Sequence, residues 1–509
     1  MTRTDEADPR RRAARLRQDA RRALDARDFR AAAAALVPLV AAEPGDPDGH
    51  GLLAAVRAEL GDLPGAAAAY AAGLRLRPGH RPTANLLGGL LLRMNAVDRA
   101  LAVLEPVAAA ATDDAALQAT YAVALFRAER FADAEAAARR AIARDPGLVP
   151  AWINLGSARR LQGDNAGALA ATETALRLAP DLPEAHFNRA LALLCLGRFA
   201  EGWDEHDWYW RQPHTPPRPL PQPRWDGAPA AGTVALWGDQ GVGDEIWASA
   251  FVPALLRAGH RLAIECAPRL VPLFARSFPG TTIVAAATPP DPRLTAPGIV
   301  AQAPLARLPA LAWRRDGSAT RPDERLVTDP VRTADLRARY RRLAGSRTVV
   351  GIAWRSRKPD GQRIEVPIDA WGPLLLRRDL FVVDLQYGDT EGDRIAAMAR
   401  FGAHIHRDPE VDALADLDGF AAQVAAMDRV ATAVNATVAT ALAVGVPPLV
   451  AVRAHQPDWR YPPAAAASPW LPGARLFRQS DPARWEDVMA AIAAAIPGPG
   501  QSPGGRASP

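Results

Sequence analysis

The segment "AWINLGSARRLQGDNAGALAATETALRLAP" (residues 151–180) decides the fold of the N-terminal part of this 509-residue chain. Its pattern returns at a spacing of 34 residues, which is the interval from Pro146 to Pro180. Small residues allow two helices to pack closely, Gly or Asn tolerates a left-handed turn between them, and Pro ends the second helix. The columns that keep this spacing are Pro44, Pro78, Thr112, Pro146 and Pro180; Gly61, Asn95, Glu129, Gly163 and Gly197; Ala54, Gly88, Ala122, Gly156 and Ala190; and Ala34, Ala68, Ala102, Ala136 and Ala170. They predict a stack of helix pairs.

This register resembles the tetratricopeptide repeat over about residues 10 to 211. The resemblance implies a right-handed solenoid over residues 1–211 whose concave face binds a peptide or protein. A rigid spacer or a dimerisation surface is the alternative. The tryptophans near its end, Trp203, Trp208 and Trp210, are expected to form a capping core. The proline-rich segment 212–231 is predicted to be a semi-rigid connector or a strap over the surface.

From Gly232 onward, short β-rich runs alternate with helical ones, beginning with "TVALW" (233–237) and again with "RTVVGIAW" (347–354). Such alternation predicts parallel sheets covered by helices. We therefore expect two Rossmann-like lobes, at 232–345 and 346–497, that face a cleft. The fold class is α + α/β, and the tail at 498–509 is predicted to be disordered.

Charge and apolar patterning narrow the possible partners and location. The net charge is only +5, and no dense basic run occurs, which argues against a nucleic-acid partner. The stretch from Ala431 to Val452 is uncharged but contains Asn435, Gly445 and two prolines, so it is predicted to form a helix, a turn and a strand rather than a membrane span. Without an apolar core near its start, the chain has no signal-peptide pattern and is predicted to be cytoplasmic.

The loop "WGDQGVGDEIW" (237–247) follows a predicted strand and precedes a predicted helix. It is not a dinucleotide fingerprint, because Ile246 occupies the third glycine position, and no P-loop occurs. Gly241 and Gly243 are expected to shape the turn. Asp244 would then either cap the helix or serve as a general base at the mouth of the cleft.

Five segments in order, "DQGVGDEIWASAFVPALLRAGHRLAIE", "VVGIAWRSR", "FVVDLQYGD", "AHQPDWRY" and "SPWLPGARLFRQ", resemble glycosyltransferase family 9, the heptosyltransferase group. The chain is most similar to bacterial members in which tetratricopeptide repeats precede such a domain. The resemblance implies a GT-B architecture with an acceptor-side first lobe and a nucleotide-sugar-side second lobe. It also implies inverting transfer of a hexosyl or heptosyl group without a metal or cofactor, with Asp244 as the base.

The same resemblance implies a donor site on the second lobe. Positive side chains that follow a strand would hold the diphosphate, and a helix start and a polar segment would complete the site. The candidates are Arg355, Arg357, Lys358 and Arg363; Asn435 and Thr437; and Asp458 and Arg460, with Trp459 between them. The alternatives are a solvated charge run for the first group and a structural ion pair for Asp458 and Arg460.

The chain departs from the family at several positions. Ala439 stands where relatives have a histidine, and Val434 where many have an aspartate. Glu245 and Trp247 replace smaller or amide residues. Two hypotheses follow: an enzyme that transfers a sugar to a protein or surface-glycan acceptor presented by the repeats, or an inactive scaffold that acts through protein binding.

Overall fold

The structure is a computed structural model that describes residues 9–213, 215, 218–317, 321–357, 363–455, 458–463 and 465–498. The sequence-predicted donor residue Lys358 and nearly all of the predicted tail lie outside the described residues. The chain forms two compact units, Met1–Ala192 and Leu193–Pro509, which are described separately below.

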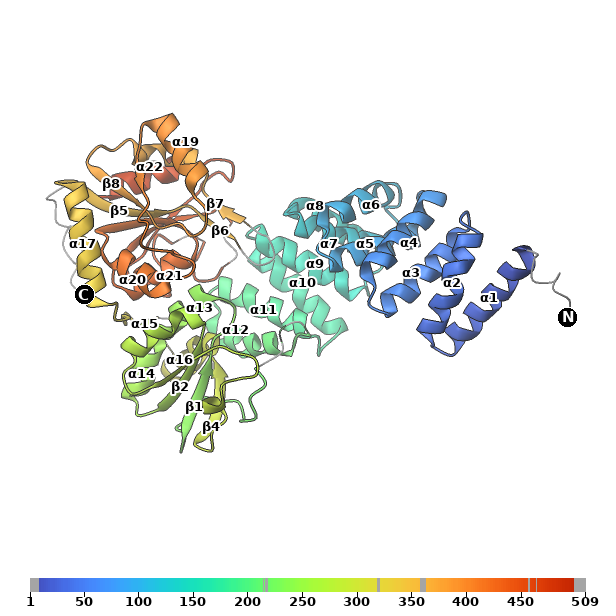
Figure 1. Cartoon of the computed structure of the whole chain (residues 1–509), viewed down its shortest axis with the longest axis horizontal. Coiled ribbons are helices and arrows are strands. Elements are labelled where there is room, and N and C mark those ends of the chain that lie inside the picture. The colour runs from blue at the N-terminus through green and yellow to red at the C-terminus, as the bar shows by residue number, and fades with distance from the viewer. Residues whose placement is uncertain are drawn as a thin grey trace. The chain divides into compact units, whose positions relative to one another are not determined.

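The first unit consists of helices joined by short turns into consecutive pairs (Figure 1). This confirms the predicted tetratricopeptide-repeat solenoid. The helices are α1 (Pro9–Asp25), α2 (Phe29–Ala42), α3 (Pro47–Glu59), α4 (Leu63–Leu76), α5 (Arg81–Arg93), α6 (Val97–Ala110), α7 (Ala115–Arg127), α8 (Phe131–Arg144), α9 (Val149–Leu161), α10 (Asn165–Leu178) and α11 (Pro183–Cys195), the last of which runs into the second unit.

Turns between paired helices use the left-handed backbone that the sequence columns predict. Gly61 has φ 81°, Asn95 has φ 56° and Glu129 has φ 60°. Just beyond two of these turns, Asp62 and Asp164 cap the next helix through their carboxylates. The local sequence is therefore sufficient to start and stop these helices.

The small-residue column brings the helices of a pair close together. A Cβ atom on Gly88 would lie 2.6 Å from the side chain of Leu104, and one on Gly156 would lie 2.9 Å from the side chain of Thr172. A larger residue at either position would need the partner helix to shift. A continuous apolar core results, in which Leu36, Leu87 and Leu104 are buried.

The second unit begins with α12 (Phe199–His206) and contains a first sheet of four parallel strands in the order β3-β2-β1-β4. The strands are β1 (Thr233–Trp237), β2 (Arg261–Cys266), β3 (Thr282–Ala285) and β4 (Ile299–Pro304). The helices between and after them are α13 (Val242–Ala248), α14 (Val252–Arg257), α15 (Val271–Ser277) and α16 (Leu308–Asp316). β4 and α16 were not predicted from the sequence.

A second sheet of six strands has the order β12-β11-β10-β5-β8-β9, and all its pairings are parallel. The strands are β5 (Thr348–Ala353), β8 (Leu380–Asp384), β9 (Ile405–His406), β10 (Arg429–Ala433), β11 (Pro448–Val452) and β12 (Arg475–Arg478). Its helices are α17 (Pro330–Ala344), α18 (Gly372–Leu375), α19 (Glu391–Phe401), α20 (Leu417–Ala425), α21 (Ala436–Ala443) and α22 (Glu486–Ala495). The two parallel sheets confirm the α + α/β class.

Helix α17 precedes the second sheet in the chain but packs on that side. The Tyr340 hydroxyl donates to Asp408 at 2.8 Å and accepts from Gln423 of α20 at 3.0 Å. The predicted lobe boundary after residue 345 would instead group this helix with the first sheet.

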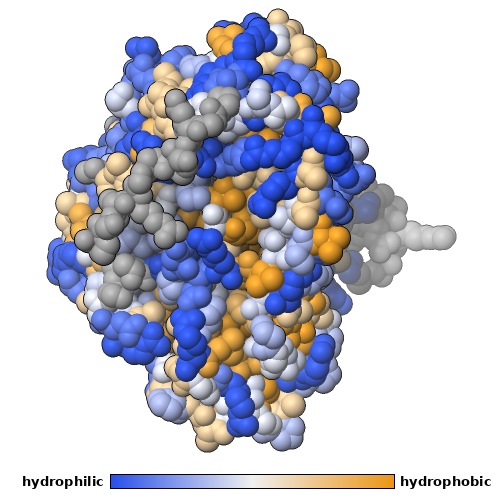
Figure 2. Space-filling view, turned by 90° about the vertical axis from the view of Figure 1, so that its left-hand side faces the viewer, coloured by the Kyte–Doolittle hydropathy of each residue, from blue (hydrophilic) through white to orange (hydrophobic). Residues whose placement is uncertain are grey.

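On the face of this unit that Figure 2 shows, apolar side chains appear between hydrophilic ones that cover most of the surface.

The described part of the proline-rich connector runs along the first sheet. Arg224 bridges to Gln302 of β4, and the Trp225 backbone N–H donates to the Gln302 carbonyl at 2.8 Å. Arg218 forms a bidentate ion pair with buried Glu265 at 2.7 Å. These contacts correspond to a strap over the surface of the first sheet rather than to a free semi-rigid connector.

The uncharged stretch that raised the question of a membrane span contains α21 and β11. Within the described residues, no helix is both long and apolar enough to cross a membrane.

Candidate active site

Each sheet has one place where the chain order reverses, and ligands of open α/β sheets bind outside the carboxyl ends of the strands at such a place. In the first sheet the reversal lies between β1 and β4, and in the second it lies between β5 and β10. The loops that follow these four strands are therefore the positions to examine. Asp239 and Asp244 follow β1, and Asn435 follows β10.

The two reversal points lie next to each other. A Cβ atom on Gly243, at the start of α13, would be 3.2 Å from both the Cα and the Cβ of Ala436, the first residue of α21. Gly243 thus permits a close approach between the two lobes. Gly241 has extended backbone and open space around it, and the left-handed residue of this loop is Gln240, at φ 65°.

Asp244 lies on the first turn of α13, and an arginine from the other lobe contacts its carboxylate. Arg460 Nη1 donates to Asp244 Oδ1 at 2.8 Å, and the same guanidinium contacts both carboxylate oxygens of Asp458, with Nη2 2.8 Å from Oδ2. Burial opposes the charge of Arg460, yet Asp458 and Asp244 raise the pKa of its guanidinium. The side chain of Asp244 remains 33% exposed. The pair expected within one lobe is therefore a three-membered ion cluster that joins both lobes.

Aromatic side chains cover one side of this cluster. The Arg460 guanidinium lies 5.3 Å from the ring of Trp247 and 6.0 Å from that of Trp459, which is the range of cation–π attraction. Trp247 Nε1 donates to the backbone carbonyl of Trp470 at 2.8 Å. Trp203 of α12 is 1% exposed and packs edge-to-face on Trp459 at 5.1 Å. Below, the tryptophan cluster means Trp203, Trp247, Trp459 and Trp470.

Asp239 lies nearer the end of β1 than Asp244 does, but it was not among the site residues predicted from the sequence. Its Oδ1 accepts from the Ala306 backbone N–H at 3.3 Å, across the reversal point, and its Oδ2 is buried without a hydrogen-bond partner among the described residues. Burial raises the pKa of Asp239 to about 7, and the charges of Asp244 and Glu245 add to this effect. The available signal was its position, two residues after a buried parallel strand.

Glu245 is a second carboxyl with a high pKa in this loop. It is 6% exposed, and its Oε2 accepts from the Ala267 backbone N–H at 2.9 Å. Burial raises its pKa to about 7, with Glu265 and Asp244 contributing. A Cβ atom on Gly238 would lie 2.5 Å from the Glu245 carboxyl carbon, so this glycine makes room for the acid. Glu245 therefore holds the loop after β2 in place.

On the second lobe, Asn435 caps α21. Its Oδ1 accepts from the Thr437 backbone N–H at 2.9 Å, and its Nδ2 donates to the Arg355 carbonyl at 3.3 Å. The Thr437 side chain is buried. The Arg355 guanidinium forms an ion pair with Asp393 at the start of α19. These contacts support the loop structure.

Two further second-lobe candidates, Arg357 and Arg363, belong to a pair of short antiparallel strands, called the β6–β7 hairpin below. Arg357 ends β6 (Arg355–Arg357) and pairs with Arg363, which begins the antiparallel strand β7 (Arg363–Glu365).

Ala439, at the position of the family histidine, is 7% exposed and belongs to the apolar core. Within the described residues, no group of three or more His, Cys, Asp or Glu side chains is arranged to hold a metal ion.

The architecture defines this chain as a tetratricopeptide-repeat protein with a two-lobed, parallel α/β C-terminal region. A tetratricopeptide-repeat family model matches residues 18–81, 85–149 and 153–202. The chain is also 29% identical over 510 residues to Protein FlbA of Caulobacter vibrioides, in an alignment that covers 87% of this chain and 83% of FlbA. The similarity to FlbA therefore extends well beyond the repeats.

Two of the similar solved structures each match less than half of this chain. MamA (41-end) from Desulfovibrio magneticus RS-1 is 26% identical, and the match covers 33% of this chain and 96% of that chain with a TM-score of 0.31. PilW, described as a widely conserved type IV pilus biogenesis factor, is 18% identical, and the match covers 39% of this chain and 93% of that chain with a TM-score of 0.35.

Proposed function

We propose that the α/β region is an inverting, metal-independent glycosyltransferase that transfers a sugar from a nucleotide-sugar to a protein or surface-glycan acceptor. One observation carries the proposal: the partly exposed carboxylate of Asp244 lies where the reversal points of two parallel sheets meet. The sequence resemblance to glycosyltransferase family 9 supports the same reaction.

In this reaction the acceptor hydroxyl attacks the anomeric carbon as the bond to the diphosphate oxygen breaks. Asp244 takes the hydroxyl proton, and the nucleoside diphosphate leaves with the bonding electron pair. Arg460 contacts Oδ1 of Asp244, so the hydroxyl would approach Oδ2. The arginine fixes the orientation of the carboxylate.

The diphosphate would lie against the start of α21 and the β6–β7 hairpin. The hairpin carries Arg357 and Arg363, and Arg355 is its first residue. Because Asp393 pairs with Arg355, donor binding through that arginine requires a diphosphate that competes with this carboxylate. Arg460 is likewise shared between Asp458 and Asp244.

A non-catalytic scaffold is the second candidate, and the same ion pairs favour it. Around the reversal points, the guanidinium groups of Arg355 and Arg460 are both neutralised by carboxylates of the chain. The buried methyl group of Ala439 offers a donor nothing to bind. The scaffold would act through protein binding by the repeats.

Calorimetric titration of the full chain with a panel of nucleotide-sugars separates the two candidates. The enzyme predicts saturable binding of one donor and sugar transfer that Asp244→Asn abolishes while donor affinity stays within about twofold. Asp291→Asn, at a partly exposed carboxylate paired with Arg293, is the matched control and should leave transfer unchanged. The absence of heat with every donor would reject the enzyme in favour of the scaffold.

A further inference from the structure

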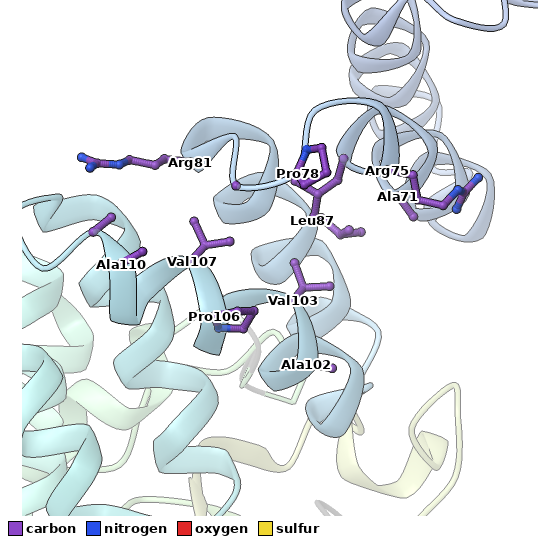
Figure 3. A pocket seen from close by; sticks show the side chains of 13 residues that line it. Ala71, Arg75, Pro78, Arg81, Leu87, Ala102, Val103, Pro106, Val107 and Ala110 are labelled. Atoms are coloured by element: carbon purple, nitrogen blue, oxygen red, sulfur yellow. The ribbon is translucent and has the colours of Figure 1, made fainter.

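A groove lies within the first unit, between α4 and α6, which are the second helices of two consecutive pairs. Its cavity measures about 780 Å³. The apolar lining includes Leu74, Leu87, Val103 and Val107, and Arg75 and Arg81 stand at its edges (Figure 3). It is called the α4–α6 groove below. A volume of this size is within the range of binding pockets, roughly 300–1,000 Å³.

Comparison with the next repeat shows why the groove is open. There, Arg140 of α8 donates from Nε to Gln118 Oε1 of α7 at 2.8 Å, and Gln118 Nε2 reaches the Ala108 carbonyl of α6 at 2.7 Å. These two long side chains tie three helices together. The residues 34 positions earlier are Pro106 and Ala84, and neither has a polar side chain that can span the gap. The groove is thus a consequence of particular residues at this repeat.

The exposed surface of α6 beside the groove suits a third helix. Ala102, Pro106 and Ala110 are all exposed and are spaced four residues apart, so they lie along one face of α6. Small side chains in such a row allow another helix to approach closely. Larger apolar side chains on that helix would reach the lining formed by Leu74, Leu87 and Val103.

The charged residues of the groove have one sign. Arg75 and Arg81 lie on opposite sides in Figure 3, and no carboxylate is among the described residues that line the groove. Arg81 contacts Asp113 at 3.0 Å, but this pair is exposed and therefore weak. Arginines at two edges of an apolar surface complement an acidic partner.

We propose that the α4–α6 groove binds an amphipathic, acidic helix of a partner protein. Leucine-sized side chains of that helix fill the cavity, and glutamate or aspartate residues that flank them contact Arg75 and Arg81. This is the helix-in-groove mode of recognition, which uses side chains at three- and four-residue spacing. The site is independent of the sugar-transfer chemistry proposed above, because none of its residues comes from the α/β region.

Fluorescence anisotropy of a labelled synthetic helix, with leucine on one face and glutamate on the other, tests this on the full chain. We expect saturable binding that Pro106→Arg weakens at least about tenfold, because the arginine fills the groove as Arg140 does in the next repeat. Thr174→Arg places the same side chain at the equivalent position of α10 and should leave binding unchanged. Thermal unfolding by circular dichroism checks that both variants fold.

Charge reversal tests the second part of the proposal. Arg75→Glu should weaken binding about threefold to tenfold, whereas Arg177→Glu, at the equivalent position of α10, should not. A version of the peptide with lysine in place of glutamate should bind at least about tenfold more weakly. Equal binding of the two peptides, or binding that Pro106→Arg does not change, would overturn the proposal.

Absence of saturable binding by the glutamate peptide would also overturn it. A second copy of this chain is the competing occupant, and sedimentation velocity distinguishes it. Concentration-dependent dimerisation that Pro106→Arg abolishes, without peptide binding, would show that the groove is a self-association surface instead.

Discussion

The repeat array and the α/β region differ in how each residue obtains its role. In the array, each position recurs every 34 residues. Gly88 and Gly156 therefore both allow close packing of a helix pair in different repeats, and Pro106 can be compared with Arg140. In the α/β region each site residue is unique, and Asp244 depends on Arg460, 216 residues further along the chain. The array therefore provides internal controls, whereas the α/β region must be tested through its long-range contacts.

The largest expected effect tests whether the tryptophan cluster stabilises the second unit. Trp203→Ala removes a side chain that is 1% exposed and packs on Trp459 and Trp470, and should lower the free energy of unfolding by about 3–5 kcal/mol. Only Trp152 of the thirteen tryptophans precedes the second unit, so tryptophan fluorescence during urea unfolding mainly reports that unit. Trp208→Ala, at a half-buried ring, should cost less than half as much. Equal effects would show that the cluster has no special importance.

The next effect concerns pH, again in the α/β region. Burial raises the pKa of Asp239 to about 7, above its value in the unfolded chain, so the folded state binds the extra proton. This contribution is complete below about pH 4 and is lost as the pH rises through about 7. Urea unfolding at pH 5 and pH 8 measures the loss of stability between these two pH values. In Asp239→Asn this loss should be smaller than in the unmodified protein by on the order of 1–3 kcal/mol.

Asp291 serves as a control because its pKa is shifted in the opposite direction. Its hydrogen bonds with Arg293 lower its pKa to about 2, so its contribution is present above the unfolded pKa and is lost as the pH falls toward 2. Asp291→Asn should leave the difference between pH 5 and pH 8 unchanged. If Asp239→Asn also leaves it unchanged, the Asp239 carboxyl is ionised in the folded state at neutral pH.

A smaller effect tests close packing in the repeats. Gly88→Ala places a Cβ atom 2.6 Å from Leu104 and should destabilise the array by about 1–3 kcal/mol. Its neighbour on α5, Gly89, has no atom within 4 Å of the added Cβ, and Gly89→Ala should stabilise by up to about 1 kcal/mol through helix propensity. Hydrogen exchange of α5 and α6 measures both. The same sign for both variants would contradict the packing role of the small-residue column.

The smallest effect lies at a turn. Glu129 has φ 60°, in the left-handed region, at the position where three other repeats have Gly61, Gly163 and Gly197. Glu129→Gly should stabilise the array by about 0.5–1 kcal/mol because the strain on a residue with a Cβ atom disappears. Thermal unfolding followed by circular dichroism measures the shift. Glu135→Gly, within α8, is the contrasting change and should destabilise.

Most of the fold could be predicted from the sequence. The repeat columns predicted the helix pairs, and the apolar runs predicted strands such as β1 and β5, because these signals are local. β4 was missed because its apolar run is interrupted by Gln302 and ends at Pro304, and both features weaken the signal of a strand. The path of the connector beside β4 could not be predicted because proline content determines stiffness but not which surface a segment covers.

Less of the candidate site could be predicted. The position of Asp244 after a strand was evident in the sequence, and so was the absence of a histidine at position 439. Asp239 could have been found by the same rule of position. Arg460, the partner of Asp244, could not have been found in this way, because an ion pair between residues so far apart in sequence depends on how the two lobes pack together.

By itself, the sequence determined the repeating helix pairs, the alternation of strands and helices, and the acid-bearing turn after β1, since these follow from neighbouring residues. Only the tertiary structure decided that the two reversal points adjoin, that Arg460 joins Asp458 to Asp244 beside Trp247 and Trp459, and that a groove lies between α4 and α6 at Pro106. The physical reason is that ion pairing, burial and cavity shape depend on distances in space, which segments remote in sequence establish only when they pack together.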